Sequence, residues 1–348
     1  MKRNVKIMTG LGTYLKDYLE FEGITQTQFA MQLGISQKHM NRILNNKADL
    51  STDLMYAISI LTDIDINFIA SIENKRKVVE YLNEKFKSEV GIKEYLKKFK
   101  INELKKNGWI KFKDITNVYQ NAVDILKFLK FRNFEVLNNT DSILYKKTLN
   151  KKELTALWIA RCDELAKGQI VEDYNKSNLK EVIKAINNYV YTEGKIEIQY
   201  IKELMNKNGI YFVLEEGLPT SGIRGAFKIY KGKPAVYIST FNKRVDGLVY
   251  SLFHELGHVK SDFNQGKSKV IVEGTKEQED RADKFAYTNM VPENILNDIS
   301  INFSEKHLLE VSKDNKIPMC YMVSQLTNNG IYKYTGSMYK KHIRKIEE

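Results

Sequence analysis

The first 218 residues of the chain contain no proline, and all four prolines follow: Pro219, Pro234, Pro292 and Pro318. Proline interrupts a helix because it lacks a backbone N–H and its ring clashes with the preceding turn. The proline-free part also repeats apolar residues at helical spacing. We therefore predict that residues 1 to about 205 are mostly helical.

The apolar period changes after Asn208 and Gly209, where short runs rich in β-branched and aromatic residues begin. Lys231 and Gly232 indicate a hairpin turn between two of these runs. The expected elements are strands at residues 210–214, 226–230 and 235–238 and helices at residues 246–259 and 276–289. The predicted fold class is therefore mainly α with an α+β C-terminal domain.

The composition fits a globular chain with two or three domains, because 348 residues are 43% hydrophobic and 28% charged. No run of eighteen apolar residues occurs, so we expect no membrane partner. Two distant cysteines exclude a disulfide scaffold, and Met1–Gly10 lacks the apolar segment of a secretory signal, so we expect a cytoplasmic protein.

The net charge is +12, but residues 1–75 carry eight basic and eight acidic side chains. We therefore interpret the excess mainly as a lysine-rich solvated surface.

Residues 23–47 predict two short helices joined by a tight turn. Thr25 and Gln28 form a capping-box pattern that starts the first helix. Gly34 stands where the chain must turn in a left-handed conformation, and Ser36 caps the second helix. This pattern is typical of a helix-turn-helix, although a helix pair within a larger bundle is the alternative.

The outward positions of the second helix are Gln37, Lys38, His39, Asn41 and Arg42. Glutamine and asparagine can form paired hydrogen bonds with adenine, and arginine can do so with guanine. Gln26, at the start of the first helix, is placed to meet a phosphate. These side chains are the predicted contacts with a double-stranded DNA operator.

Residues 13–72 resemble an XRE-type helix-turn-helix domain, closest to the HigA-type antidotes of plasmid-maintenance systems. The resemblance rests on the GITQ run at residue 23, the LGIS run at residue 33 and the ILNNK run that ends at Lys47. It implies a lambda-repressor-like domain of five helices, major-groove binding by a homodimer, and Lys47 among the DNA contacts. The near-neutral local charge is a departure that reduces the gain from counterion release.

His254-Glu255-Leu-Gly-His258 is an H-E-x-x-H motif within a run of helical apolar spacing. Residues four apart share one helical face, so both imidazoles can bind one Zn²⁺ ion. Glu255 lies beside them and is the predicted catalytic residue, a general base and acid. Two surface histidines without a metal are the alternative.

A catalytic zinc site needs a third protein ligand. Glu279, on the second expected helix, can supply a carboxylate, and Asp283 one turn later can hold the other ring N–H of a histidine. Glu277 and Asp280 are competitors for the ligand position, and an acidic helix face can also be simply solvated.

Residues 178–335 resemble the ImmA/IrrE family of zinc metallopeptidases, a gluzincin-like group, through the FHELGH run at residue 253, the EDRADKFA run at residue 279 and the MVP run at residue 290. The resemblance implies one zinc per chain, Glu279 as ligand, and a zincin-like domain with a small antiparallel sheet. The family often has an acidic residue where Arg281 stands. The strand Ala235–Ser239 is expected to serve as the edge that aligns a substrate peptide.

The predicted domains are a helix-turn-helix domain at residues 1–75, a helical middle region at 76–177, the zincin-like domain at 178–335 and a basic tail at 336–348. Relatives in the resembled family cleave helix-turn-helix repressors. We therefore expect a DNA-binding regulator with a zinc metallo-endopeptidase domain that acts on a regulatory protein. The alternative is a HigA-like autorepressor whose zincin domain binds a partner, such as a toxin, without proteolysis.

Overall fold

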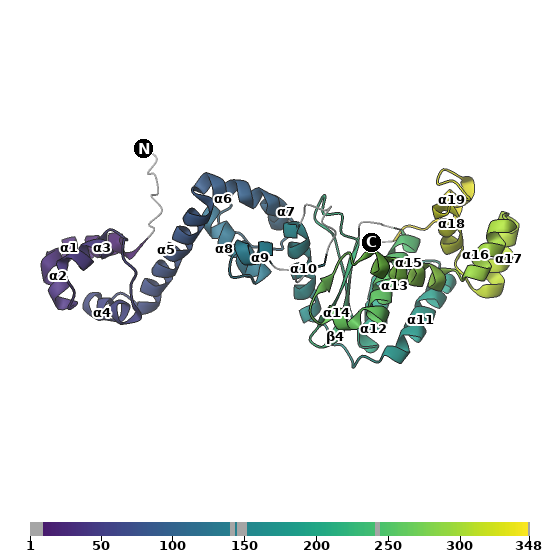
Figure 1. The fold of residues 1–348 in the computed structure, drawn as a ribbon, viewed down its shortest axis with the longest axis horizontal. Helices are drawn as coiled ribbons and strands as arrows, with labels where there is room; N and C mark the ends of the chain where they lie inside the picture. The colour runs from purple at the N-terminus through teal and green to yellow at the C-terminus, as the bar shows by residue number, and fades with distance from the viewer. Residues whose placement is uncertain (1–9, 140–142, 145–151, 241–243, 347–348) are drawn as a thin grey trace. The chain divides into compact units, whose positions relative to one another are not determined.

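The computed structural model describes residues 10–139, 143–144, 152–240 and 244–346 (Figure 1). Residues 1–9, on which the expectation about a secretory signal rests, lie outside this part. The chain divides into two compact units, Met1–Ile125 and Leu126–Glu348. Helices dominate both units, and the second holds a small sheet, so the predicted fold class is confirmed. The domain limits drawn from the sequence stay predictions.

The first unit is helical throughout the residues described. Its elements are α1 (Leu11–Glu22), α2 (Gln26–Gln32), α3 (Gln37–Leu44), α4 (Thr52–Thr62), α5 (Ile66–Phe86), α6 (Glu89–Leu96), the 3-10 helix η1 (Lys97–Phe99), α7 (Ile101–Lys106) and α8 (Val118–Leu129), which crosses into the second unit.

Local signals define the α2–α3 pair, as the sequence predicted. The backbone N–H of Gln28 donates to the hydroxyl of Thr25, and the backbone N–H of Thr25 donates to the side chain of Gln28. Gly34 has a φ of +67°, and the hydroxyl of Ser36 caps α3. Phe29 and Met40 are buried in the core of α1–α5. The helix-turn-helix is therefore built from its own capping residues.

In its described residues, the second unit combines helices with five short strands. Its elements are α9 (Phe134–Asn139), β1 (Ile143–Leu144), α10 (Lys152–Lys167), the 3-10 helix η2 (Lys176–Asn178), α11 (Leu179–Glu193), α12 (Ile198–Lys207), β2 (Tyr211–Glu215), β3 (Gly225–Tyr230), β4 (Lys233–Ser239), α13 (Val245–Ser261), α14 (Phe263–Gly266), β5 (Val270–Ile271), α15 (Lys276–Met290), α16 (Glu293–Ile301), α17 (Glu305–Asn315), α18 (Met319–Asn328) and α19 (Ser337–His342).

The sheet has the strand order β1-β5-β3-β4-β2 and is mixed rather than wholly antiparallel. β3 and β4 form the predicted antiparallel hairpin, with Lys231 and Gly232 at positive φ in its turn. β4 also pairs with β2, in parallel, and β1 pairs with β5 in parallel. The expectation that Ala235–Ser239 is an edge strand is therefore wrong, because β4 has hydrogen-bonded strands on both sides.

Helices cover both faces of this sheet. Val236 and Ile238 belong to the apolar core that includes α13, whereas Tyr237, between them, contacts Trp158 of α10 at a ring-centroid distance of 6.4 Å. Successive side chains of a strand point to opposite faces, so α13 and α10 lie on opposite sides of β4. α13 is thereby fixed between the sheet and α15, which it also contacts. No helix in the described part is long and apolar enough to cross a membrane.

Candidate metal centre

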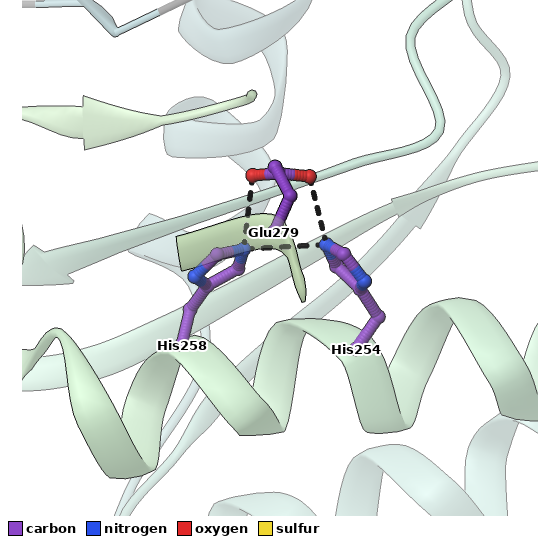
Figure 2. A group of neighbouring side chains, drawn as sticks. All are labelled: His254, His258 and Glu279. Carbon is purple, nitrogen blue, oxygen red and sulfur yellow. Dashed lines mark hydrogen bonds and ion pairs between the residues drawn. The ribbon is translucent and has the colours of Figure 1, made fainter. Parts of the chain in front are cut away.

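The two histidines of the H-E-x-x-H motif lie one turn apart on α13 and point to the same side (Figure 2). Their Nε2 atoms are 3.2 Å apart. His258 is buried and His254 is nearly so, because α13 packs against the sheet and against α15. The apolar residues of α13 therefore anchor the helix rigidly beneath the imidazole pair.

Glu279 on α15 faces both histidines (Figure 2). Its Oε2 lies 3.3 Å from Nε2 of His254, and its Oε1 lies 3.5 Å from Nε2 of His258. Gly257 lets the two helices approach, because a Cβ there would lie 3.0 Å from the Cα of Ala282. Among the residues described, His254, His258 and Glu279 are the group whose donor atoms converge closely enough to hold a metal ion.

The spacing of these donor atoms fits a tetrahedral zinc site. Zinc binds histidine nitrogen and carboxylate oxygen at about 2.0–2.1 Å, which in a tetrahedron separates the ligand atoms by about 3.3–3.4 Å. The two nitrogens are 3.2 Å apart, and the separations of 3.3 and 3.5 Å join them to different oxygens of Glu279, Oε2 for His254 and Oε1 for His258. Two nitrogens and one oxygen are also the donor set that catalytic zinc sites use, with a fourth position left open.

Carboxylates hold the other ring nitrogen of each histidine. Nδ1 of His254 lies 2.7 Å from Oδ1 of Asp283, which also accepts a hydrogen bond from the hydroxyl of Tyr250. Nδ1 of His258 lies 2.8 Å from Oδ2 of Asp262. Donation from Nδ1–H to a carboxylate leaves the lone pair on Nε2, where a metal would bind.

The electrostatics of this cluster favour positive charge at the two imidazoles. Burial opposes protonation of His254, but its bonds to Asp283 and Glu279 outweigh burial and raise its pKa to about 10. The pKa of His258 is also raised against the effect of burial, chiefly by Glu279. Burial disfavours the charge of Glu279, yet the two histidines lower its pKa. The site attracts either protons or a metal cation.

Glu255 lines the same cavity as His254 and Glu279. The cavity has a volume of about 900 Å³, and Glu255, Gly225 and Tyr250 are among its lining residues. The carboxylate of Glu255 is 3% exposed, and its Oε2 has no hydrogen-bond partner in the described structure. Burial raises the pKa of Glu255 to about 7, although the nearby histidines oppose this. Such a group can exchange a proton near neutral pH.

The competitors for the third ligand position do not converge with the histidines. Glu277 is exposed, and Asp280 lines the cavity, but neither belongs to the converging group. Sequence reasoning missed Asp262 and Tyr250. Tyr250 lies four residues before His254, and Asp262 lies four residues after His258. Helical spacing was therefore the signal that could have found them.

The predicted DNA-contacting side chains lie on the surface of the α2–α3 pair. The exposed ones are Gln37, Lys38, Asn41, Arg42 and Lys47, and the half-buried ones are Gln26 and His39. Gln26 Nε2 donates to the backbone oxygen of Gln37 at 3.2 Å, and Arg42 donates to the backbone oxygen of Lys47 at 3.1 Å. These bonds link the start of α2 to α3, and α3 to the loop that follows it.

Comparison with family models found two matches. Residues 148–304 match the family model described as Peptidase U49, and residues 15–69 match the model described as Helix-turn-helix. The chain thus joins an XRE-type helix-turn-helix domain to a Peptidase U49-type domain. The first match spans α13 and α15, which carry the candidate metal ligands. Comparisons with curated proteins and with solved structures found no match.

Proposed function

We propose that this protein is a DNA-binding regulator whose peptidase-like domain is a zinc-dependent endopeptidase. His254, His258 and Glu279 would hold the zinc, Asp283 and Asp262 would orient the histidines, and Glu255 would move the proton. The matches to a peptidase family and to a helix-turn-helix family support this combination.

The position of Glu255 carries the proposal. Its Oε2 is buried without a hydrogen-bond partner among the residues described, beside a group of donor atoms spaced for zinc. An unpaired buried carboxylate is costly, and such groups concentrate at functional sites. Glu255 also lines a cavity of about 900 Å³ rather than lying wholly within the apolar core.

The protein residues divide the work of peptide hydrolysis. When bound, zinc would supply Lewis-acid polarisation of the reacting groups. The carboxylate of Glu255 would accept a proton from a water molecule and return a proton to the departing amine. Asp283 and Asp262 would keep the Nδ1 protons of the histidines in place throughout. The hydroxyl of Tyr250, bonded to Asp283, would fix that carboxylate.

The helix-turn-helix would bring the peptidase to an operator as a homodimer. The base edges of the major groove would be contacted by Gln37, Lys38, Asn41 and Arg42. The phosphates would be contacted by Gln26 and Lys47, and His39 would lie between these two groups of contacts. We propose that the substrate is a regulatory protein of the same circuit, and a helix-turn-helix repressor is the first candidate.

The decisive experiment compares Glu255→Gln with the wild type. Both purified proteins are loaded with zinc and incubated with a peptide library derived from helix-turn-helix proteins, and new N-termini are identified by mass spectrometry. We expect cleavage by the wild type, at least a hundredfold less by Glu255→Gln, and equal zinc content. Asp280→Asn is the matched control, because it changes an acid on the cavity wall outside the ligand group.

Equal cleavage by wild type and Glu255→Gln would refute the role of Glu255. An absence of cleavage by the wild type, with zinc bound, would favour the HigA-like alternative, in which the domain binds a partner such as a toxin without proteolysis. Co-purification of the chain with the product of an adjacent gene would then identify that partner.

A further inference from the structure

A second cleft opens on the peptidase-like domain, away from the metal ligands. It has a volume of about 590 Å³ and lies between η2, α11, the end of α13 and α15. None of its lining residues belongs to the cavity that holds the metal ligands. Its rim is basic, so we call it the cationic groove, and the five basic residues that define it are Lys176, Lys180, Lys260, Arg281 and Lys284.

Acidic neighbours neutralise only part of this positive charge. Arg281 pairs with Asp262 at 3.1 Å, and Lys284 pairs with Glu293 at 3.2 Å. Lys176, Lys180 and Lys260 are exposed and form no ion pair within the described part of the chain. Three positive charges from three separate elements therefore surround one cleft without compensation, which favours an anionic partner.

The floor of the cationic groove is apolar. Leu179 and Ile183 of α11 and Phe285 of α15 line it, and the ammonium of Lys260 lies 4.9 Å from the centre of the Phe285 ring. A nucleic-acid backbone offers phosphates and sugars, which gain little from Leu179 and Ile183, and the ammonium of Lys260 lies against the aromatic ring of this floor on which a base could stack. A peptide with acidic and apolar side chains satisfies both the rim and the floor.

We propose that the cationic groove docks an acidic segment of a protein partner. An apolar side chain of that segment lies on Leu179, Ile183 and Phe285, and its carboxylates pair with Lys176, Lys180 and Lys260. This docking is independent of whether a metal is bound.

Arg281 connects the cationic groove to the candidate metal centre. Its side chain is 52% exposed and donates to Oδ1 of Asp262, whose Oδ2 lies 2.8 Å from Nδ1 of His258. A peptide carboxylate that pairs with Arg281 withdraws positive charge from Asp262. Asp262 then becomes a stronger acceptor for His258, which favours a cation at the Nε2 of that histidine. This coupling, unlike the docking itself, rests on the proposed function.

The docking is tested by fluorescence anisotropy with the full-length, metal-free chain. The probe is a fluorescein-labelled peptide in which pairs of glutamates alternate with leucine, and a peptide with glutamine in place of glutamate is its control. We expect the double variant Lys180→Glu and Lys260→Glu to bind the acidic peptide at least tenfold more weakly, about the loss of two charged pairs. The double variant Lys306→Glu and Lys313→Glu makes the same charge change at exposed positions of α17 and should bind as the wild type does.

A second probe separates proteins from nucleic acids. A labelled DNA duplex of random sequence should bind the wild type and the double variant equally. Equal binding of the acidic peptide to both proteins would overturn the proposal. A loss that affects the duplex and spares the peptide would also overturn it, because the groove would then be a nucleic-acid surface.

The coupling is tested by zinc affinity, measured against a chromophoric chelator with and without saturating acidic peptide. We expect the peptide to tighten zinc binding about three- to fivefold in the wild type and to have no effect on zinc binding in Arg281→Gln. By linkage, zinc should tighten peptide binding by the same factor. Peptide binding without any change in zinc affinity would refute the coupling. Failure of the wild type to bind zinc would refute the proposed metal centre and leave the anisotropy result standing.

Discussion

Gly225 begins β3 directly against Glu255, and adding one methyl group there should displace the carboxylate of this proposed proton carrier. A Cβ at this position would lie 2.3 Å from Oε1 of Glu255, where ordinary contact begins at 3.4 Å. The carboxylate must therefore retreat by about 1 Å. A displacement of this size can lower catalysis about a hundredfold, which corresponds to about 2.7 kcal/mol in the activation barrier.

Gly225→Ala should therefore lose about a hundredfold in kcat/KM on a peptide found in the library experiment. Its zinc affinity should stay within about twofold of the wild type, because the methyl group meets Glu255 and not the three donor residues. Thermal unfolding should show a stability loss of about 1–3 kcal/mol from overpacking. The control is Gly168→Ala, where an added Cβ meets nothing within 4 Å. Wild-type turnover by a folded Gly225→Ala variant would refute the placement of Glu255 as the proton carrier.

Three further perturbations follow from the contacts described. Asp283→Asn should weaken zinc binding about 10- to 100-fold in a chelator competition, because Nδ1 of His254 loses its carboxylate; unchanged affinity would contradict the orienting role. The pKa of His254 is raised from 6.5 to about 10 without metal. The stability that its proton contributes is therefore complete below pH 6.5 and is lost as the pH rises toward 10. Urea denaturation of the metal-free chain should accordingly show a free energy of unfolding that falls from pH 7 to 10. A flat profile would exclude a stabilising proton on His254. Arg76→Ala should destabilise the first unit by about 3–5 kcal/mol in a urea titration, because it leaves Glu73, which is 3% exposed, without its cation. The control is Lys77→Ala, which should cost little because the side chain of Lys77 is exposed.

Local signals account for what could be predicted of the fold. The capping box at Thr25 and Gln28 and the left-handed Gly34 each involve residues close in sequence, so their geometry follows from their identity. The β3–β4 hairpin was predictable for the same reason, from its Lys231 and Gly232 turn. The place of β4 in the sheet was not, because its parallel pairing with β2 joins segments separated by an intervening strand and loops.

The candidate site divides in the same way. The spacing of His254 and His258 fixes them on one helical face, whatever the rest of the chain does. The choice of Glu279 over Glu277 depends on how α15 rotates against α13, which approach each other closely at Gly257. The sequence favoured Glu279 through the position of Asp283 one helical turn later and through a family resemblance, and neither gives the rotation of the helix.

Contacts within the protein position the two histidines of the candidate metal centre. Asp283 lies on α15 and Asp262 lies between α13 and α14, and each holds the Nδ1 of one histidine. The two Nε2 atoms therefore face each other at 3.2 Å, a contact that only a shared proton or a cation makes favourable. The free energy needed to bring these groups together is supplied by the packing of α13 and α15. Metal binding should consequently stabilise the fold without rebuilding it, and far-ultraviolet circular dichroism of the chain should be the same with and without zinc while its unfolding temperature rises. A gain of helix on adding zinc would contradict this preorganisation.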